Sequence, residues 1–270
     1  MQHFIHLVNA NYVLSLTFQM FLALTLPVIL VIIFKLWQKW SFSIRQRLFA
    51  TYMSGLSEAF DLALQSRKPK HVEKLKHIVS SDSELRVKKQ IRILEIGCGS
   101  GANLKHFPEG SRLIMLDLNE QFFPKLRENL NSYPGLILER IVRADAAAMQ
   151  EHVADNSVDV VMSQYVLCSC DDVPAVLREV HRVLAPAGSF FFIEHVIDKP
   201  GTFRRLVQRF LMISKIWPYL GCGCDVAKDC AKFFKNAGFT KIESEDFYMA
   251  SRFHPSFHFI KPNIIGVATK

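Results

Sequence analysis

The chain has 270 residues, half of them hydrophobic, and a formal net charge of +8 at pH 7. This length suits one α/β domain with an appendage, and the composition argues against a disordered or fibrous chain. A net charge of this size can indicate nucleic-acid binding. However, residues 1–34 hold no Asp, Glu, Lys or Arg, residues 35–92 hold 13 Lys and Arg against 5 Asp and Glu, and residues 93–270 hold 20 of each. The excess charge therefore belongs to one segment, and no nucleic-acid partner is expected.

The N-terminal run from Tyr12 to Phe34 is apolar and free of charge. As a helix it would extend about 30–35 Å, enough to cross the hydrocarbon core of a bilayer. A cleaved signal peptide is disfavoured, because the run is too long and no Lys or Arg precedes it. Lys35 and further basic residues follow at once, which places that flank in the cytoplasm by the positive-inside rule. We predict a membrane anchor over residues 1–40; insertion as a hairpin bent at Pro27 is the alternative.

Residues 41–90 are predicted to form a basic helical linker at the membrane surface. Apolar side chains recur there at helical spacing, at Leu48, Phe49, Tyr52, Met53 and Leu56. Basic side chains near an anionic leaflet contribute up to about 1 kcal/mol each to membrane binding. A solvated linker face is the plainer alternative.

The six cysteines predict neither a disulfide framework nor a structural metal. A chain of this size does not need disulfides, and no pair has the CxxC spacing of a zinc site. Cys168 and Cys170 follow a predicted strand, where packing cysteines are commoner than reactive ones. Cys222 and Cys224 are candidates for binding a soft metal or a metalloid such as arsenic.

Residues 91–270 alternate predicted strands and helices, which indicates a three-layer α/β sheet. A buried strand over residues 92–96 leads into a glycine-rich turn from Gly97 to Gly101, the arrangement of a nucleotide-binding sheet. Asp117 ends the second strand, where a carboxylate can accept both hydroxyls of a ribose; an N-cap is the alternative role. Asp145 ends the third strand.

Further strands are predicted over residues 157–163 and 189–194, with a helix over residues 173–184 between them. Residues 203–220 combine an apolar face with interspersed arginines, which is typical of an interfacial helix or a lid. A helix over residues 226–236 and strands near 240–247 and 264–268 complete the chain.

These motifs resemble the class I S-adenosylmethionine-dependent methyltransferases, over residues 91–270. The resemblance rests on Glu95 to Gly101, Asp117, Asp145-Ala146, residues 157–161 and residues 184–188. Closer similarity, at residues 99–103, 167–169 and 192–196, is to the membrane-associated thiol S-methyltransferases, the methyltransferase-like 7 family. The resemblance implies a Rossmann-like three-layer sandwich with a seven-stranded, mostly parallel sheet.

The resemblance also implies which residues bind S-adenosyl-L-methionine. The expected cofactor-binding residues are Glu95, Gly97, Cys98, Gly99, Gly101, Asp117, Leu118, Asp145, Ala146, Gln164 and Tyr165. Two departures from the family pattern stand out. Its acidic stretch near the adenine is replaced by residues 146–148, all alanine, and its adjacent cysteine pair is interrupted by Gly223.

Methyl transfer from a sulfonium to a thiol needs alignment, desolvation and a thiolate nucleophile. His195, at the end of the fifth predicted strand, is the candidate general base, and a structural histidine is the alternative. Glu194 is expected to orient rather than to ionise the acceptor.

The resulting prediction is a membrane-anchored methyltransferase that acts on the sulfur of a small lipophilic thiol or on hydrogen sulfide. The resemblance implies a location at the endoplasmic reticulum membrane and lipid droplets, with the catalytic domain in the cytosol. A lipophilic phenol, quinone, amine or metalloid is the alternative acceptor, because the motifs bind the cofactor and not the acceptor. A non-catalytic membrane or lipid-droplet recruitment protein is the alternative of another class.

Overall fold

The structure is a computed structural model that describes residues 25, 29, 32–33, 35–37 and 40–270. The chain divides into two units, residues 1–45 and residues 46–270. The predicted span from Tyr12 to Phe34 lies outside the described residues, except for positions 25, 29 and 32–33. Within the described part of the chain, no helix is both long and apolar enough to cross a bilayer.

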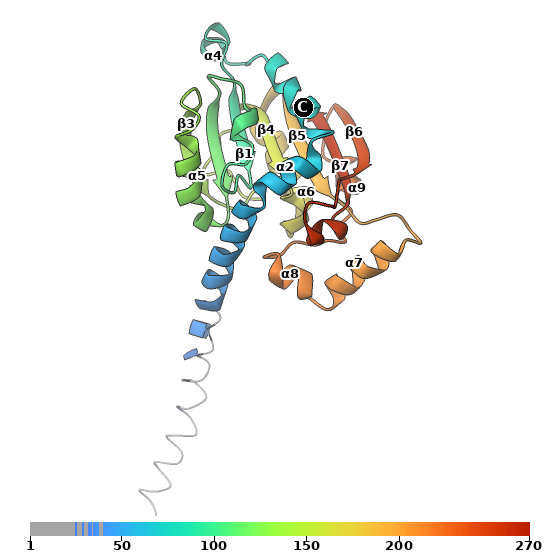
Figure 1. Ribbon diagram of the computed structural model, residues 1–270. Coiled ribbons are helices and arrows are strands. Elements are labelled where there is room, and N and C mark those ends of the chain that lie inside the picture. Colours follow the sequence, from blue (N-terminus) through green and yellow to red (C-terminus); the bar gives the residue numbers. More distant parts are fainter. Residues whose placement is uncertain (1–24, 26–28, 30–31, 34, 38–39) are drawn as a thin grey trace, which may run out of the picture. The chain divides into compact units, whose positions relative to one another are not determined.

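The larger unit is built on a seven-stranded sheet with the order β3-β2-β1-β4-β5-β7-β6 (Figure 1). All neighbouring strands run parallel except β7, which is antiparallel to both β5 and β6. The strands are β1 Arg92–Ile96, β2 Arg112–Asp117, β3 Ile137–Arg143, β4 Val158–Gln164, β5 Leu184–His195, β6 Lys241–Tyr248 and β7 Pro262–Thr269. The predicted seven-stranded, mostly parallel sheet is confirmed.

Side chains of the central strands alternate between two apolar cores, one on each face of the sheet. Leu113 and Met115 of β2 pack on one face, and Ile114 and Leu116 pack on the other. This alternation follows from the two-residue period of a strand, and it is the reason that parallel strands covered on both faces are almost continuously apolar.

Helices cover both faces. The helices and short 3-10 turns are α2 Ser57–Leu64, α3 Lys68–Glu73, η1 Lys74–His77, α4 Ser83–Val87, η2 Leu104–His106, η3 Glu120–Phe122, α5 Phe123–Leu130, η4 Leu167–Ser169, α6 Val173–Val183, α7 Phe203–Ile213, α8 Ile216–Leu220, α9 Ala231–Phe234 and η5 Pro255–His258. Helices α6 and α9 supply one core, whereas α3, η1, η2 and α5 supply the other. The three-layer arrangement is therefore confirmed.

Much of the predicted linker over residues 41–90 belongs to the compact unit. Leu64 of α2 packs with Ile193 and Phe257 in a third core cluster, and Leu75 of η1 packs with Ile93 of β1. Lys68 of α3 is almost fully buried, and its Nζ donates to Asp61 Oδ1 at 2.9 Å. The role of this segment at a membrane surface stays a prediction.

Two predicted helices differ from the structure. The helix expected over residues 226–236 is confined to Ala231–Phe234, because turns occupy the residues before it. The single amphipathic segment expected over residues 203–220 is divided into α7 and α8. Lys215 lies between them in the left-handed region at φ 56°, which interrupts a continuous helix.

Candidate active site

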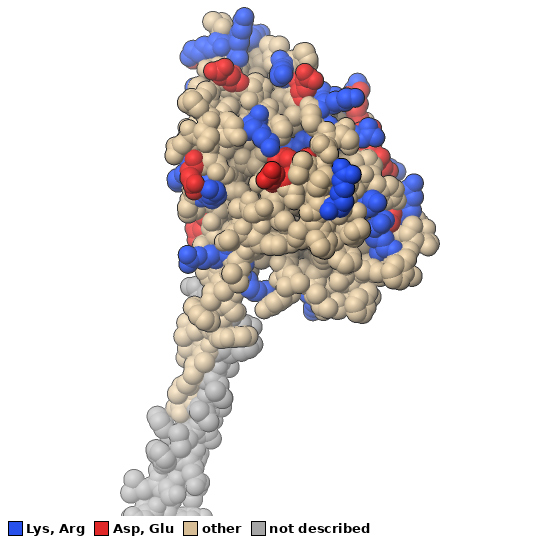
Figure 2. All heavy atoms as spheres, in the orientation of Figure 1, with Lys and Arg blue, Asp and Glu red and all other residues tan. Residues whose placement is uncertain are grey.

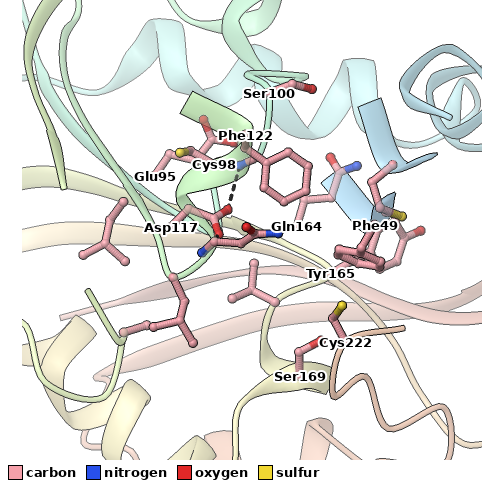
Figure 3. Close-up of a pocket in the computed structure, with 18 of the residues that line it drawn as sticks. Phe49, Glu95, Cys98, Ser100, Asp117, Phe122, Gln164, Tyr165, Ser169 and Cys222 are labelled. Carbon is pink, nitrogen blue, oxygen red and sulfur yellow. Dashed lines mark hydrogen bonds between the residues drawn. The ribbon is translucent and has the colours of Figure 1, made fainter. Parts of the chain in front are cut away.

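A cavity of about 300 Å³ opens at the carboxyl ends of β1, β2 and β4. Ligands of open α/β sheets collect at this edge, because the connections that follow the strands diverge there. Glu95 of β1, Asp117 of β2 and Gln164 of β4 all line the cavity. Figure 3 shows Glu95, Cys98 and Asp117 on one side of the pocket and Phe49, Tyr165 and Cys222 on the other.

The glycine-rich turn after β1 has the backbone geometry that the sequence predicts. Gly97, Gly99 and Gly101 have φ values of 62°, 51° and 83°, a region that side chains with a Cβ rarely adopt. A Cβ on Gly97 would overlap a methyl group of Val166, which follows β4. Gly97 is therefore required for the close approach of two strand ends.

Asp117 holds this turn against the end of β2. Its Oδ2 accepts a hydrogen bond from the Gly99 N–H at 2.9 Å, and its Oδ1 accepts one from the Asn119 N–H at 2.8 Å (Figure 3). Burial raises the pKa of Asp117, although these backbone N–H groups act in the opposite direction. The carboxylate is thus fixed at the cavity wall, with its remaining acceptor capacity available to a ligand.

Three buried oxygens around the cavity accept no hydrogen bond from the described residues. Asn103 Nδ2 donates to Glu95 Oε1 at 2.7 Å, but Glu95 Oε2, Asn103 Oδ1 and Gln164 Oε1 have no partner. Burial raises the pKa of Glu95 to about 8, while the hydrogen bond from Asn103 lowers it. Unpaired buried acceptors are costly, so this group of oxygens fits a ligand that carries several N–H or O–H donors. The amino-acid part of S-adenosylmethionine has such donors.

The structure brings most of the predicted cofactor residues to one cavity. Its lining includes Glu95, Gly97, Cys98, Gly99, Asp117, Leu118, Asp145, Ala146, Gln164 and Tyr165. Gly101 is not among the lining residues. A Cβ at Gly101 would approach Leu104 and Leu126 within 2.8 Å, so this glycine permits packing of the turn against η2 and α5.

One wall of the cavity, formed by helical residues before the sheet, was not predicted from the sequence. Gln46, Phe49 and Met53 line the cavity from the helix over residues 46–55, and Ser57 and Phe60 line it from α2. The helical spacing of Phe49 and Met53 could have indicated this wall. It was interpreted instead as an apolar face that lies at the membrane surface. An amphipathic pattern identifies a buried face without identifying what covers it.

Tyr165 directly follows β4 and contacts both this wall and a residue of the sheet. Its φ of 59° places it in the left-handed region, and its hydroxyl donates to Asn263 Oδ1 at 2.8 Å. Its ring packs against Phe60, with the centroids 5.0 Å apart, and stacks on His195 at 5.9 Å. Strained backbone at a site wall is commonly retained for function.

Glu194 and His195 are buried at the end of β5, and neither lines the cavity. Glu194 Oε1 accepts hydrogen bonds from Ser163 Oγ and from the N–H groups of Val166 and Leu167, so it holds the connection after β4. A base must reach the proton that it removes. The general-base role of His195 stays a prediction, and its place behind Tyr165 argues against direct transfer from an acceptor in the cavity.

His195 instead contacts Cys224, with His195 Nε2 and Cys224 Sγ 3.2 Å apart. Burial lowers the pKa of His195, but Cys224 outweighs this effect and the pKa is raised. The contact with Cys168, together with His195, lowers the pKa of Cys224 well below its usual range, against the effect of burial. None of the six cysteines forms a disulfide.

Comparisons with known proteins agree with the geometry of the cavity and the sheet. Residues 94–192 match a methyltransferase-domain family. Human thiol S-methyltransferase TMT1B is 31% identical over 249 residues, which cover 92% of this chain and 95% of that protein. Human thiol S-methyltransferase TMT1A is 36% identical over 181 residues, covering 67% and 71%.

The fold is also similar to that of solved structures. A SAM-dependent methyltransferase from Thermotoga maritima superimposes with a TM-score of 0.51 at 15% identity, covering 82% of this chain and 98% of that one. The methyltransferase-domain match and the thiol S-methyltransferase relatives show that the chain is an S-adenosylmethionine-dependent methyltransferase. The chain belongs to the thiol S-methyltransferase family, as its similarity to the two human proteins shows.

Proposed function

We propose that this enzyme transfers the methyl group of S-adenosylmethionine to the sulfur of a small lipophilic thiol or of hydrogen sulfide. The observation that carries the proposal is the division of one cavity into a carboxylate-bearing side and an apolar side. Glu95 and Asp117 lie on the first side, and Phe49, Met53 and Phe60 lie on the second. The relatives named thiol S-methyltransferases support this choice of acceptor.

The cofactor would bind along the strand ends. Asp117 would accept the ribose hydroxyls, and Asp145 with Ala146 would flank the adenine, because both lie on the cavity wall after β3. Glu95 with Asn103 and Gln164 would accept the donors of the methionine part, which pairs their unpartnered oxygens. When bound, the cofactor supplies an electrophilic methyl group on a sulfonium.

The apolar side of the cavity, formed by Phe49, Met53 and Phe60, would exclude water from the acceptor. A thiol loses its proton with a pKa of about 8.5, and the thiolate is the nucleophile. Desolvation of the thiolate and in-line alignment against a fixed cofactor then supply most of the rate enhancement, so no strong base is required. Tyr165, with its hydroxyl already donated to Asn263, would serve as a rigid wall rather than as a proton donor.

Membrane association is the second part of the proposal. The apolar run from Tyr12 to Phe34 would anchor the chain, by spanning the membrane or as a hairpin, with the basic residues that follow it on the cytosolic side. The endoplasmic reticulum and lipid droplets are the proposed locations. Such an anchor would keep the catalytic domain close to lipophilic thiols that are dissolved in the membrane.

Helix α7 offers an independent contact with the bilayer. Phe203, Leu206, Phe210 and Ile213 are spaced along one side of the helix, and Phe203 and Ile213 are 79% and 83% exposed. In Figure 2, the surface at the position of α7 and α8 is mostly without charged residues, and Lys and Arg lie at its edges. Apolar side chains with a basic border are typical of a helix lying in the membrane interface. The lid role of the same helix remains compatible with this contact.

The proposal is tested with the full chain in detergent or vesicles and a cofactor labelled in its methyl group. A panel of alkyl and aryl thiols, hydrogen sulfide, phenols, quinones, amines and arsenite is offered under identical conditions. We expect methylated product from thiols at rates at least tenfold above those from other acceptors. Transfer confined to phenols, quinones, amines or arsenite would reject the thiol assignment, and absence of cofactor binding would favour the recruitment role.

A further inference from the structure

Three side chains from separate segments meet in one buried cluster behind the wall of the active-site cavity. Cys168 lies in η4 after β4, His195 ends β5, and Cys224 lies in the loop after α8. Their sulfur and ring-nitrogen atoms all lie within 4.8 Å of one another. None of the three residues lines the active-site cavity.

Two of the three distances within the cluster are close to those that a tetrahedral zinc ion imposes on its ligands. Zinc–sulfur bonds of about 2.3 Å at tetrahedral angles place two sulfurs about 3.8 Å apart, and a sulfur and an imidazole nitrogen about 3.5 Å apart. The Sγ atoms of Cys168 and Cys224 are 3.7 Å apart. Cys224 Sγ and His195 Nε2 are 3.2 Å apart. A shift of a few tenths of an ångström would bring these two distances to the values for a shared ion, and the remaining distance, between Cys168 and His195, is at most 4.8 Å.

The surroundings also favour a metal-bound thiolate at Cys224. Trp217 Nε1 donates a hydrogen bond to Cys224 Sγ at 3.3 Å, and such donors orient and stabilise metal-bound thiolates. Tyr165 stacks on the His195 ring and fixes its plane. An isolated buried thiolate is costly, whereas two thiolates and one neutral imidazole balance the charge of Zn²⁺.

We propose that Cys168, His195 and Cys224 supply three ligands of a zinc site. On binding, both cysteines coordinate as thiolates, and any protons that they carry pass to solvent; His195 binds through its neutral Nε2. The ion would connect the ends of β4 and β5 to the loop after α8. Gly221 and Cys222 of that loop line the active-site cavity, so the ion would fix part of the acceptor wall.

The test measures zinc content directly, using the full chain purified in detergent, reduced, incubated with Zn²⁺ and freed of unbound metal. We expect one zinc ion per chain, and tetrahedral cobalt–thiolate bands when Co²⁺ is used instead. Cys224→Ser, Cys168→Ser and His195→Ala should each weaken zinc affinity at least tenfold. Cys170→Ser is the matched control, because its thiol also lies after β4 but donates to Val166 O at 3.3 Å outside the cluster. It should keep the zinc.

A second measurement keeps the test decisive if a variant does not fold. In the wild-type chain, zinc should protect Cys168 and Cys224 from alkylation, mapped by mass spectrometry, and a chelator should remove that protection. Zinc-free wild-type protein, unchanged affinity in folded ligand variants, or a Cys168–Cys224 disulfide in place of bound metal would each overturn the proposal. Zinc content is read without methyl transfer, so these outcomes are separate from failure of the proposed activity.

Discussion

The carboxylate of Asp117 and the backbone N–H of Gly99 are joined by a 2.9 Å hydrogen bond that connects the ends of two neighbouring strands. The same carboxylate accepts the N–H of Asn119. A single side chain thereby fixes the glycine-rich turn and presents acceptor oxygens to the cavity. We therefore expect a substitution of Asp117 to disturb both the conformation of the turn and the proposed contact with the ribose.

Substitution of Asp117 should weaken cofactor binding more than it destabilises the domain. Hydrogen bonds to a charged group contribute about 1.5–3 kcal/mol each, so Asp117→Ala should lower affinity by about a hundredfold. Calorimetric titration with S-adenosylhomocysteine measures this. Glu120→Gln is the control, since Glu120 is exposed and pairs with Arg143 on the surface. Equal affinity in Asp117→Ala and wild type would remove the ribose role.

Cofactor affinity should depend on the protonation of Glu95. Burial raises the pKa of this carboxyl to about 8, so it is mostly protonated at pH 6 and ionises as the pH rises. The carboxylate attracts the positively charged amino group of the ligand, so binding favours ionisation and releases a proton. Affinity for S-adenosylhomocysteine should therefore rise between pH 6 and pH 7.5, by at most about tenfold per pH unit.

Glu95→Gln provides the control for this pH dependence. The amide cannot ionise but can still accept a hydrogen bond from Asn103 and from the ligand. Its affinity should be lower at pH 7.5 and nearly constant over the same pH range. A wild-type profile in the Gln variant would assign the titration to another group.

The apolar wall should determine acceptor size. Phe49 lines the cavity and meets Phe122 edge to face, with the ring centroids 6.3 Å apart. Burial of an aromatic side chain against a ligand contributes about 1.5–3 kcal/mol, so Phe49→Ala should raise KM for a lipophilic thiol by about tenfold or more. KM for hydrogen sulfide should change little. Leu48→Ala, one residue away and exposed, should leave both values unchanged.

The exposed face of α7 should bind lipid. We expect Phe210→Ser with Ile213→Ser to lower partitioning of residues 46–270 onto anionic vesicles at least about tenfold, because apolar side chains then leave the interface. This fragment contains all three core clusters. Ile137→Ser with Leu138→Ser is the control, since these exposed residues of β3 lie outside both α7 and the predicted membrane-surface linker. Matching losses in both double variants would indicate a nonspecific effect.

The cofactor side of the site was predictable because its residues follow strand ends in the sequence. Asp117 and Gln164 are the last residues of their strands and Glu95 is the last but one, and parallel strands bring their carboxyl ends to one edge. Gly101 was also predicted as a cofactor residue; it does not line the cavity, and it packs closely against η2 and α5. Glycine spacing indicates the shape of a turn but does not distinguish the glycine that faces the ligand.

The sequence by itself determined the α/β class, the succession of strands and helices along the chain, the glycine-rich turn and the confinement of excess charge to residues 35–92. These are properties of local pattern and composition. Only the tertiary structure decided that Phe49 and Phe60 close the cavity, and that Cys168, His195 and Cys224 meet behind it. The three residues of this cluster are far apart in the chain, and their proximity results from strand pairing and loop packing. Spacing along the sequence does not encode such contacts.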